Sequence, residues 1–293
     1  MKSPPFEYEA PETLGEVISL LQQYDEGDAK ILAGGQSLMP LLSMRMTRPV
    51  ILIDLAKLSD LDFIREESEL LAIGAMTRKR DVEESGLVRR RQPMLLAATQ
   101  LVGHQQIRNR GTVGGSMAHA DPAAEYPALA LALGVEFRAV SAEGERTITA
   151  EDFFVSYLTT ALGDSEVLTE IRVPVLAEGV GWSFLETARR HGDFALGGAA
   201  VTLELGRGGD VTASRIVLFG IGGTAVRVLE VEQMLQGERP DEGLLQEAGN
   251  KVSEVIEEPL ADAHASADYR RNLAGVLTGR ALREALARAS VRS

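Results

Sequence analysis

The sequence contains no cysteine among its 293 residues. A chain without thiols forms no disulfide, offers no thiol nucleophile and cannot itself hold an iron–sulfur cluster or a thiolate zinc site. Any such centre that works with this chain must be held by another protein. The lack of cysteine is compatible with the cytoplasm, which is where we expect the protein to work.

Long hydrophobic runs and excess positive charge are lacking too. The longest apolar runs, such as residues 128–135, are too short to cross a bilayer, and no basic segment leads into an apolar one at the start, so we expect no membrane span and no secretion signal. The net charge of −13 argues against nucleic acid or an anionic membrane as a partner. The basic cluster at residues 78–80 is read as a solvated helix end, with a docking patch as the alternative.

Histidine is scarce, with four in the chain. His119, Asp121 and Glu125 are the one combination that could be pictured as metal ligands, but they lack both the H-E-x-x-H spacing and thiolates. We therefore expect no metal site.

Two common nucleotide-binding motifs are missing as well. G-x-G-x-x-G follows none of the candidate strands, and G-x-x-x-x-G-K-[ST] is excluded because no Gly-Lys pair occurs. The chain has instead two glycine doublets followed by hydroxyls, AGGQS at 33–37 and TVGGS at 112–116. Successive glycines expose backbone N–H groups with no Cβ in the way, and a helix start behind them adds positive partial charge, which suits a phosphate.

One such doublet alone is more often a structural turn. Two doublets of the same chemistry predict two glycine corners whose amides close on one diphosphate, and therefore a dinucleotide bound without a Rossmann motif. GIGGTAV at 220–226 imitates such a loop, but its place among strands favours a turn.

Local patterns divide the chain near residues 176–180, and 45% hydrophobic residues leave ample material for two cores. In the first part we expect helices at 13–21 (capped by Thr13 and Glu16), 39–44, 78–84 (capped by Thr77), 94–102 and 123–133, and strands at 30–33, 50–55, 61–64, 70–75 (with a turn at 65–68), 135–140, 146–149 and 166–175. In the second part we expect strands at 181–190, 199–205 and 214–223, then helices at 228–236, 241–257 and 266–289.

Four segments together resemble a known family: ILAGGQSLMPLL, IRNRGTVGGSMAHADPAAEYPAL, ARRHGDFALGGAAV and ADYRRNLAGVLTGRAL. They look like the FAD-binding medium subunit of molybdenum hydroxylases, of the carbon monoxide dehydrogenase type and related to the flavin domain of xanthine dehydrogenase. The resemblance extends from FEYEAPETLGEVISLL to the final helix, which is essentially the whole chain.

The resemblance implies an α+β fold. A two-lobed FAD-binding domain of the p-cresol methylhydroxylase type (PCMH-type) is expected over 1–176, and a smaller β-sheet-plus-helices domain of the CO dehydrogenase flavoprotein C-terminal type over 177–293. The implied function is electron transfer, from a large molybdopterin subunit through a small [2Fe-2S] subunit to FAD on this chain and then to an external acceptor. The implied assembly is a heterotrimer that pairs into a dimer. No catalytic acid–base residue for substrate hydroxylation is expected here.

The resemblance also implies which residues contact FAD. They are Lys30, Ile31, Leu32, Ala33, Gly34, Gly35, Gln36, Ser37, Leu38, Val102, Thr112, Val113, Gly114, Gly115, Ser116, Ala118, Glu125, Leu168 and Phe194. Glu125 stands where relatives commonly have aspartate near the adenosine side, and Leu168 and Phe194 match positions near the flavin. Gln36 replaces a histidine found in some relatives, which implies non-covalent FAD because an amide forms no histidyl–flavin bond. Where relatives often carry a lysine, this chain has Leu185 and Glu186, so a cation beside the flavin is not evident there.

Two other functions stay open at this point. The chain could be a stand-alone FAD-dependent oxidase with its own substrate pocket, or an assembly or binding protein that has lost the cofactor. The substrate of the molybdenum partner and the final electron acceptor are not encoded in any motif that we identify.

Overall fold

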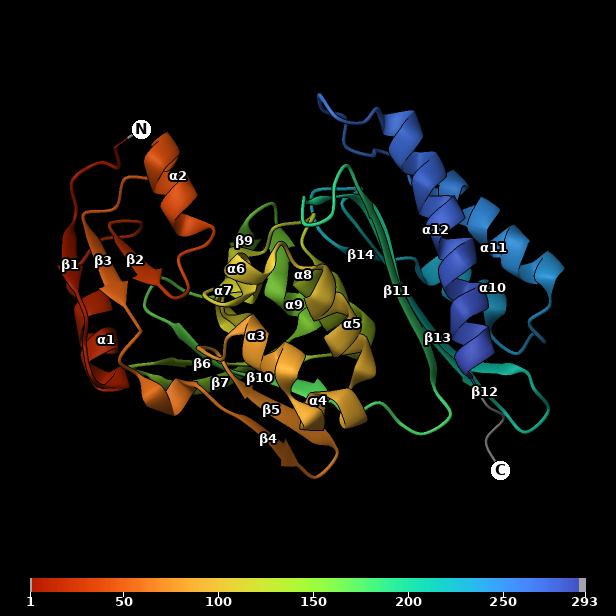
Figure 1. Ribbon diagram of the computed structural model, residues 1–293, viewed down its shortest axis with the longest axis horizontal. Helices are drawn as coiled ribbons and strands as arrows, with labels where there is room; N and C mark the ends of the chain where they lie inside the picture. The colour runs from red at the N-terminus through yellow and green to blue at the C-terminus, as the bar shows by residue number, and fades with distance from the viewer. Residues whose placement is uncertain (1, 290–293) are drawn as a thin grey trace.

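The structure is a computed structural model that describes residues 2–289. Its N-terminal lobe is a three-stranded parallel sheet in the order β1-β3-β2, flanked by two helices (Figure 1). The elements of this lobe are β1 (Glu7–Glu9), α1 (Leu14–Leu21), β2 (Ala29–Leu32), α2 (Leu38–Met44) and β3 (Ile51–Asp54).

Helix α1 begins as the sequence predicts. Thr13 accepts a hydrogen bond from the Glu16 amide and Glu16 accepts one from the Thr13 amide, so the capping box is formed. The apolar face of the helix, Val17, Ile18 and Leu21, is buried in the core of this lobe.

The second lobe is built on a five-stranded antiparallel sheet in the order β4-β5-β10-β6-β7. Its elements are η1 (Ser59–Leu61), β4 (Ile64–Glu67), β5 (Leu70–Gly74), α3 (Lys79–Glu84), α4 (Gly86–Arg91), α5 (Pro93–Leu101), α6 (Gln105–Arg108), α7 (Val113–His119), α8 (Glu125–Leu133), β6 (Glu136–Ser141), β7 (Gly144–Thr149), α9 (Ala150–Phe153), β8 (Phe154–Ser156), β9 (Thr159–Thr160) and β10 (Val167–Pro174). The core of this lobe contains Tyr126 from α8 and Phe137, Phe153 and Ile171, all fully buried.

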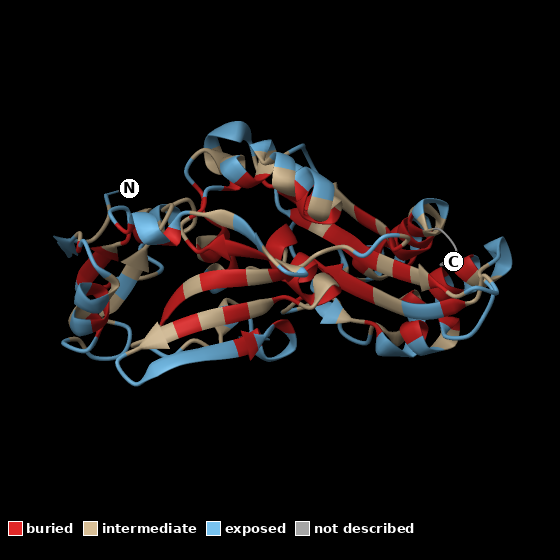
Figure 2. Cartoon of the chain, turned by 90° about the horizontal axis from the view of Figure 1, so that it is seen from below, coloured by how far each residue is buried: buried red, intermediate tan, exposed pale blue. Residues whose placement is uncertain are grey.

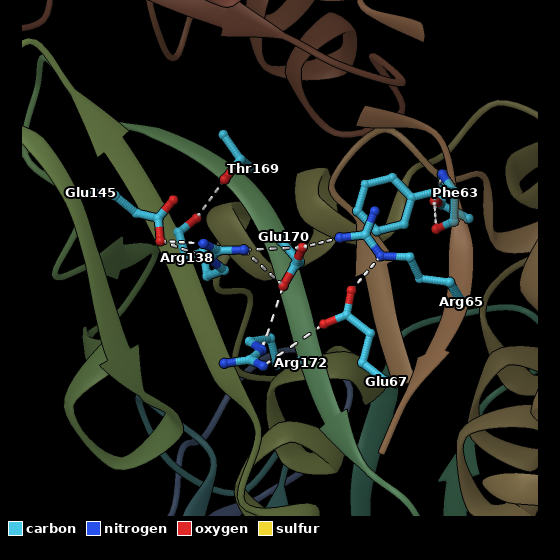
Figure 3. Close-up of polar contacts among 9 residues, drawn as sticks. Phe63, Arg65, Glu67, Arg138, Glu145, Thr169, Glu170 and Arg172 are labelled. Atoms are coloured by element: carbon cyan, nitrogen blue, oxygen red, sulfur yellow. Dashed lines mark hydrogen bonds and ion pairs between the residues drawn. The ribbon is translucent and has the colours of Figure 1, made fainter. Parts of the chain in front are cut away.

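The other face of the five-stranded sheet carries charges (Figure 3). Glu170 on β10 is only 4% exposed, and its carboxylate lies 3.2 Å from Arg65, 3.4 Å from Arg138 and 3.5 Å from Arg172. Three guanidinium groups thus compensate one buried carboxylate, which would be costly to bury alone.

The C-terminal part of the chain is a four-stranded antiparallel sheet in the order β11-β12-β13-β14, covered by three helices (Figure 1). Its elements are β11 (Gly181–Ala188), β12 (Ala195–Leu205), β13 (Val211–Phe219), β14 (Val226–Arg227), α10 (Leu229–Leu235), α11 (Glu242–Val255) and α12 (Ala267–Arg288).

This C-terminal sheet is buried on both faces (Figure 2). Ala200, Val217 and Phe219 belong to the core of the second lobe, whereas Val201 and Leu218 belong to a separate core under α10, α11 and α12. Parts of the central strands are therefore continuously buried: residues 197–201 of β12 and 216–219 of β13. The rest of β12 alternates, and residues 212–215 near the start of β13 are exposed or partly exposed.

The α+β class and the two lobes are as the sequence predicts, but three local predictions are wrong. Thr77 does not cap α3: its hydroxyl is hydrogen-bonded to the backbone of Phe63 (3.1 and 2.9 Å), and Arg78 precedes the helix without a side-chain cap. Residues 65–67 are part of β4, and the turn lies at Ser68, whose φ is +57°. Gly114 and Gly115 form no corner, because they lie in the first turn of α7, a helix that the sequence did not predict.

Within residues 2–289, no helix is both long enough and apolar enough to cross a membrane.

Candidate functional site

A cleft of about 370 Å³ is lined by residues of both lobes, and it contains both glycine doublets. Most of the residues predicted to contact FAD line it: Lys30, Ile31, Ala33, Gly34, Gly35, Gln36, Ser37, Leu38, Thr112, Gly114, Gly115, Ser116, Ala118 and Leu168. Two segments that are almost 80 residues apart in the sequence thus meet at one site.

Five of the predicted residues lie outside the lining of this cleft. Leu32 is the last residue of β2, and Val102 and Val113 are buried in the core of the second lobe. Glu125, the first residue of α8, is 7% exposed, whereas Phe194 is 62% exposed on the loop between β11 and β12.

The two doublets approach because Gly34 has no side chain. A Cβ atom at Gly34 would lie 2.3 Å from the carbonyl oxygen of Arg110 and 2.7 Å from the Cα of Gly111, closer than real contacts allow. Gly35 has a different requirement, since its φ of +72° is a left-handed conformation that favours glycine. Glycine is therefore required at position 34 by the close approach of Arg110 and at position 35 by the backbone conformation.

The first loop presents free amides to the cleft. Among the described residues, the backbone N–H groups of residues 34–37 have no hydrogen-bond acceptor, and neither has the Ser37 hydroxyl. The Gln36 side chain donates to the Gly34 carbonyl (3.2 Å) and so stabilises the loop from within. A run of unpaired N–H groups that face a cleft is a binding site for an anion.

The second loop does not offer free amides, so the expectation that both doublets do is wrong. The Gly114 amide donates to Ala75 O (2.9 Å), and the Gly115 amide donates to the Thr112 hydroxyl oxygen (3.1 Å). What this loop contributes to the cleft is hydroxyl groups. Thr112 and Ser116 line the cleft, and the Ser116 hydroxyl is bonded to no described residue.

Sequence reasoning missed several residues of the cleft wall, among them Thr47, Leu55, Met76, Lys79, His119, Leu162 and Glu166. Lys79 was read as part of a solvated helix end, yet its exposure is 5%, and burial lowers its pKa to about 8. His119 was weighed only as a metal ligand; burial lowers its pKa. No group of His, Asp or Glu within residues 2–289 is arranged to hold a metal ion.

Two buried carboxyl groups with raised pKa values, those of Glu125 and Glu186, lie outside the lining of the cleft. Burial raises the pKa of Glu125 to about 7, with Lys79 acting in the opposite direction. Burial, and then the charge of Glu125, raise the pKa of Glu186 to about 8, and Glu186 Oε2 is buried without a hydrogen-bond partner in the described chain.

The segments that contain Val102 and Phe194 are brought together by loop contacts. Arg108 donates to the carbonyls of Val102 and Gly103 (both 3.1 Å) and is itself held by Glu83 (2.8 and 3.2 Å). The loop before Phe194 rests on this segment, since a Cβ at Gly192 would lie 2.7 Å from the ring of His104.

Known proteins share both the sequence and the fold. A family model described as the FAD binding domain in molybdopterin dehydrogenase matches residues 4–176, and one described as the CO dehydrogenase flavoprotein C-terminal domain matches residues 182–285. The carbon monoxide dehydrogenase medium chain of Hydrogenophaga pseudoflava is 39% identical over 288 residues, covering 98% of this chain and 99% of the relative. Subunit alpha of the 6-hydroxypseudooxynicotine dehydrogenase complex of Paenarthrobacter nicotinovorans is 39% identical over 289 residues, covering 99% and 97%.

A solved structure of the Hydrogenophaga pseudoflava carbon monoxide dehydrogenase, which lacks the Mo-pyranopterin moiety of its molybdenum cofactor, superposes with a TM-score of 0.95. The match covers 99% of this chain and 100% of that chain at 40% identity. The unpaired amides of residues 34–37 fit the diphosphate of such a cofactor. On these grounds the chain belongs to the family of FAD-binding medium subunits of molybdenum hydroxylases.

Proposed function

We propose that this chain is the electron-transfer subunit of a three-subunit molybdenum hydroxylase. It receives electrons from a small [2Fe-2S] partner, which a large molybdopterin partner reduces, and delivers them to an external acceptor. The observation that carries the proposal is a single cleft lined both by residues 34–37, whose amides have no acceptor in the described chain, and by Thr112 and Ser116 with their hydroxyls.

These groups have separate tasks in binding. The amides of residues 34–37 would donate to diphosphate oxygens, and the Thr112 and Ser116 hydroxyls, which line the same cleft, would supply further donors. Lys30, Ile31, Leu38 and the other predicted cleft residues would enclose the cofactor. Glu125 is assigned to its adenosine side, and Leu168 and Phe194 are assigned to its flavin side; Val102 would also contact it. FAD, when bound, supplies the ability to exchange electrons singly or in pairs.

The chain leaves two other tasks to its partners. It has no cysteine, so the clusters belong to another chain. The relatives named for carbon monoxide and for 6-hydroxypseudooxynicotine are both 39% identical to this chain. The degree of identity of this subunit therefore does not indicate which substrate the complex oxidises. We assign substrate recognition to the large partner, and no substrate to this chain.

The proposed assembly is a cytoplasmic heterotrimer that pairs into a dimer. Within this chain we propose that residues 1–176 form the PCMH-type FAD-binding domain and residues 177–293 the C-terminal domain.

Co-expression with and without the partner chains tests the function. We expect FAD absorption near about 450 nm to persist in the isolated chain and to bleach under anaerobic substrate only when both partners copurify. Reduction of the isolated chain by an organic substrate would establish the stand-alone oxidase instead. Absence of any flavin band would establish the cofactor-free protein.

A further inference from the structure

Lys79 is a buried cation on the wall of the cleft. It is the first residue of α3, it is 5% exposed, and its backbone amide donates to Gly111 O (2.9 Å). That hydrogen bond ties it to the residue immediately before Thr112, at the start of the second loop.

The ammonium group has no acceptor in the described chain. It makes no hydrogen bond and no ion pair there, and its polar contact is with the ring of Tyr126, whose centroid is 5.3 Å from Nζ. Nζ is not among the fully enclosed side-chain atoms that lack a partner, so this ammonium, on a residue that is only 5% exposed, keeps access to the cleft that the residue lines. A largely desolvated ammonium with no acceptor of its own is suited to bind an anion there.

The ammonium also lies where the two loops meet. The position of a Cβ on Gly111 would be 3.6 Å from Lys79 Nζ and 3.6 Å from Cγ of Gln36. Because both atoms lie 3.6 Å from that position, Nζ is at most 7.2 Å from Cγ of Gln36 in the first loop, and it lies beside Gly111, which directly precedes Thr112.

The charges around Lys79 do not neutralise it. Glu125 of α8 raises the pKa of Lys79, but less than burial lowers it, and the two side chains form no ion pair. Burial raises the pKa of Glu125 itself to about 7, and burial lowers the pKa of His119 of α7. Asp121 acts on both Glu125 and His119, and Glu186 of β11 faces Glu125.

We propose that the Lys79 ammonium binds the diphosphate of FAD and completes the anion site begun by the amides of residues 34–37. This inference rests on the proposed function, because it presumes that FAD occupies the cleft. Lys79 would then provide a full positive charge at the site, whereas the backbone amides of the glycine-rich loop provide only partial charges.

Binding of the diphosphate by Lys79 would therefore be accompanied by uptake of a proton on the Lys79 amino group. The pKa of free Lys79 is lowered to about 8 by burial, and a neighbouring diphosphate raises it again. Above pH 8 the protein therefore takes up a proton as FAD binds, and the affinity for FAD falls as the pH rises further.

The test uses the whole chain, stripped of FAD, as wild type, Lys79→Met and Lys79→Arg. FAD is titrated by flavin fluorescence, and ADP, which carries the diphosphate without the flavin, by competition with FAD. Lys79→Met should weaken FAD and ADP alike by at least about tenfold, the loss typical of one charge-assisted hydrogen bond. Its thermal unfolding without FAD should be unchanged or raised, because a buried charge has been removed.

Calorimetry in buffers of different ionisation enthalpy should give proton uptake on FAD binding for the wild type above pH 8 and none for Lys79→Met. Lys79→Arg keeps the charge and should bind FAD without that uptake. Equal affinity of Lys79→Met for FAD, or a loss for FAD with none for ADP, would overturn the inference while leaving FAD binding intact. A wild-type chain that fails to bind FAD would overturn the proposed function instead.

Discussion

Gly34 lies against the main chain of Arg110 so closely that a single added Cβ would be 2.3 Å from the Arg110 carbonyl oxygen. The first glycine loop and the segment leading into α7 are therefore in direct contact, with nothing but hydrogen on Gly34 between them. This contact sets the width of the cleft at the place where the free amides face it.

Gly34→Ala should separate these two segments. We expect loss of most bound FAD and a destabilisation of about 1–3 kcal/mol, because the neighbouring atoms belong to the backbone and cannot rotate away. The ratio of flavin to protein absorption after purification and the thermal midpoint are the measurements. Gly15→Ala, where a Cβ meets nothing within 4 Å, is the control and should keep both values. Full FAD content in Gly34→Ala would show that the contact does not matter.

Gln36 should leave FAD unattached by any covalent bond. Its amide donates to the Gly34 carbonyl (3.2 Å) and has no nucleophilic nitrogen for a flavin. Precipitation with acid should therefore release all of the yellow colour into the supernatant, and a denaturing gel should show no fluorescent protein band. Colour retained in the washed pellet would contradict this prediction.

Glu186 should make stability depend on pH. Its pKa is raised from 4.5 to about 8 by burial, so the folded chain holds a proton that the unfolded chain releases within this range. The stabilisation is complete below pH 4.5 and is lost as the pH rises towards 8. Glu186→Gln should flatten that decline and stabilise the chain by on the order of 2 kcal/mol at the upper end.

Thermal melts across that pH range provide the measurement for Glu186→Gln. Glu26→Gln, on an exposed position, is the control and should follow the wild-type curve. Parallel curves for wild type and Glu186→Gln would show that this carboxyl group titrates normally.

Glu170→Gln should be strongly destabilising. The carboxylate is the buried acid that Arg65, Arg138 and Arg172 share (Figure 3). Without it these guanidinium groups keep only more exposed partners, such as Glu67 and Glu145. We expect a loss of about 3 kcal/mol in the free energy of unfolding, measured with urea. Lys57→Met is the control: it removes the exposed Lys57–Glu12 pair (3.0 Å) and should cost less than about 0.5 kcal/mol. Similar losses in both variants would refute the role assigned to Glu170.

Structural features that depend on residues close together in the sequence could be predicted from it. The capping box of Thr13 and Glu16 and the apolar face of α1 involve residues within one helix, and both are present.

Features with distant causes could not be predicted. The amide of Gly114 donates a hydrogen bond to Ala75 O, and no residue near Gly114 in the sequence indicates that this acceptor lies beside it. Lys79 resembles a surface lysine until Tyr126 of α8 and Gly111 are folded over it. Thr77 was read as a cap because its partner, Phe63, is 14 residues away, in the segment between η1 and β4, and no local pattern indicates that contact.

The C-terminal sheet inserts Val217 and Phe219 into the same core as Tyr126 of α8. The two segments that separate family models match therefore share one hydrophobic core, and we expect them to unfold together. A fragment that ends at Pro174 would expose the apolar residues of α8 that the C-terminal sheet covers. We expect this fragment to aggregate and not to bind FAD as an independent domain. Heating the intact chain should melt both segments in a single endotherm.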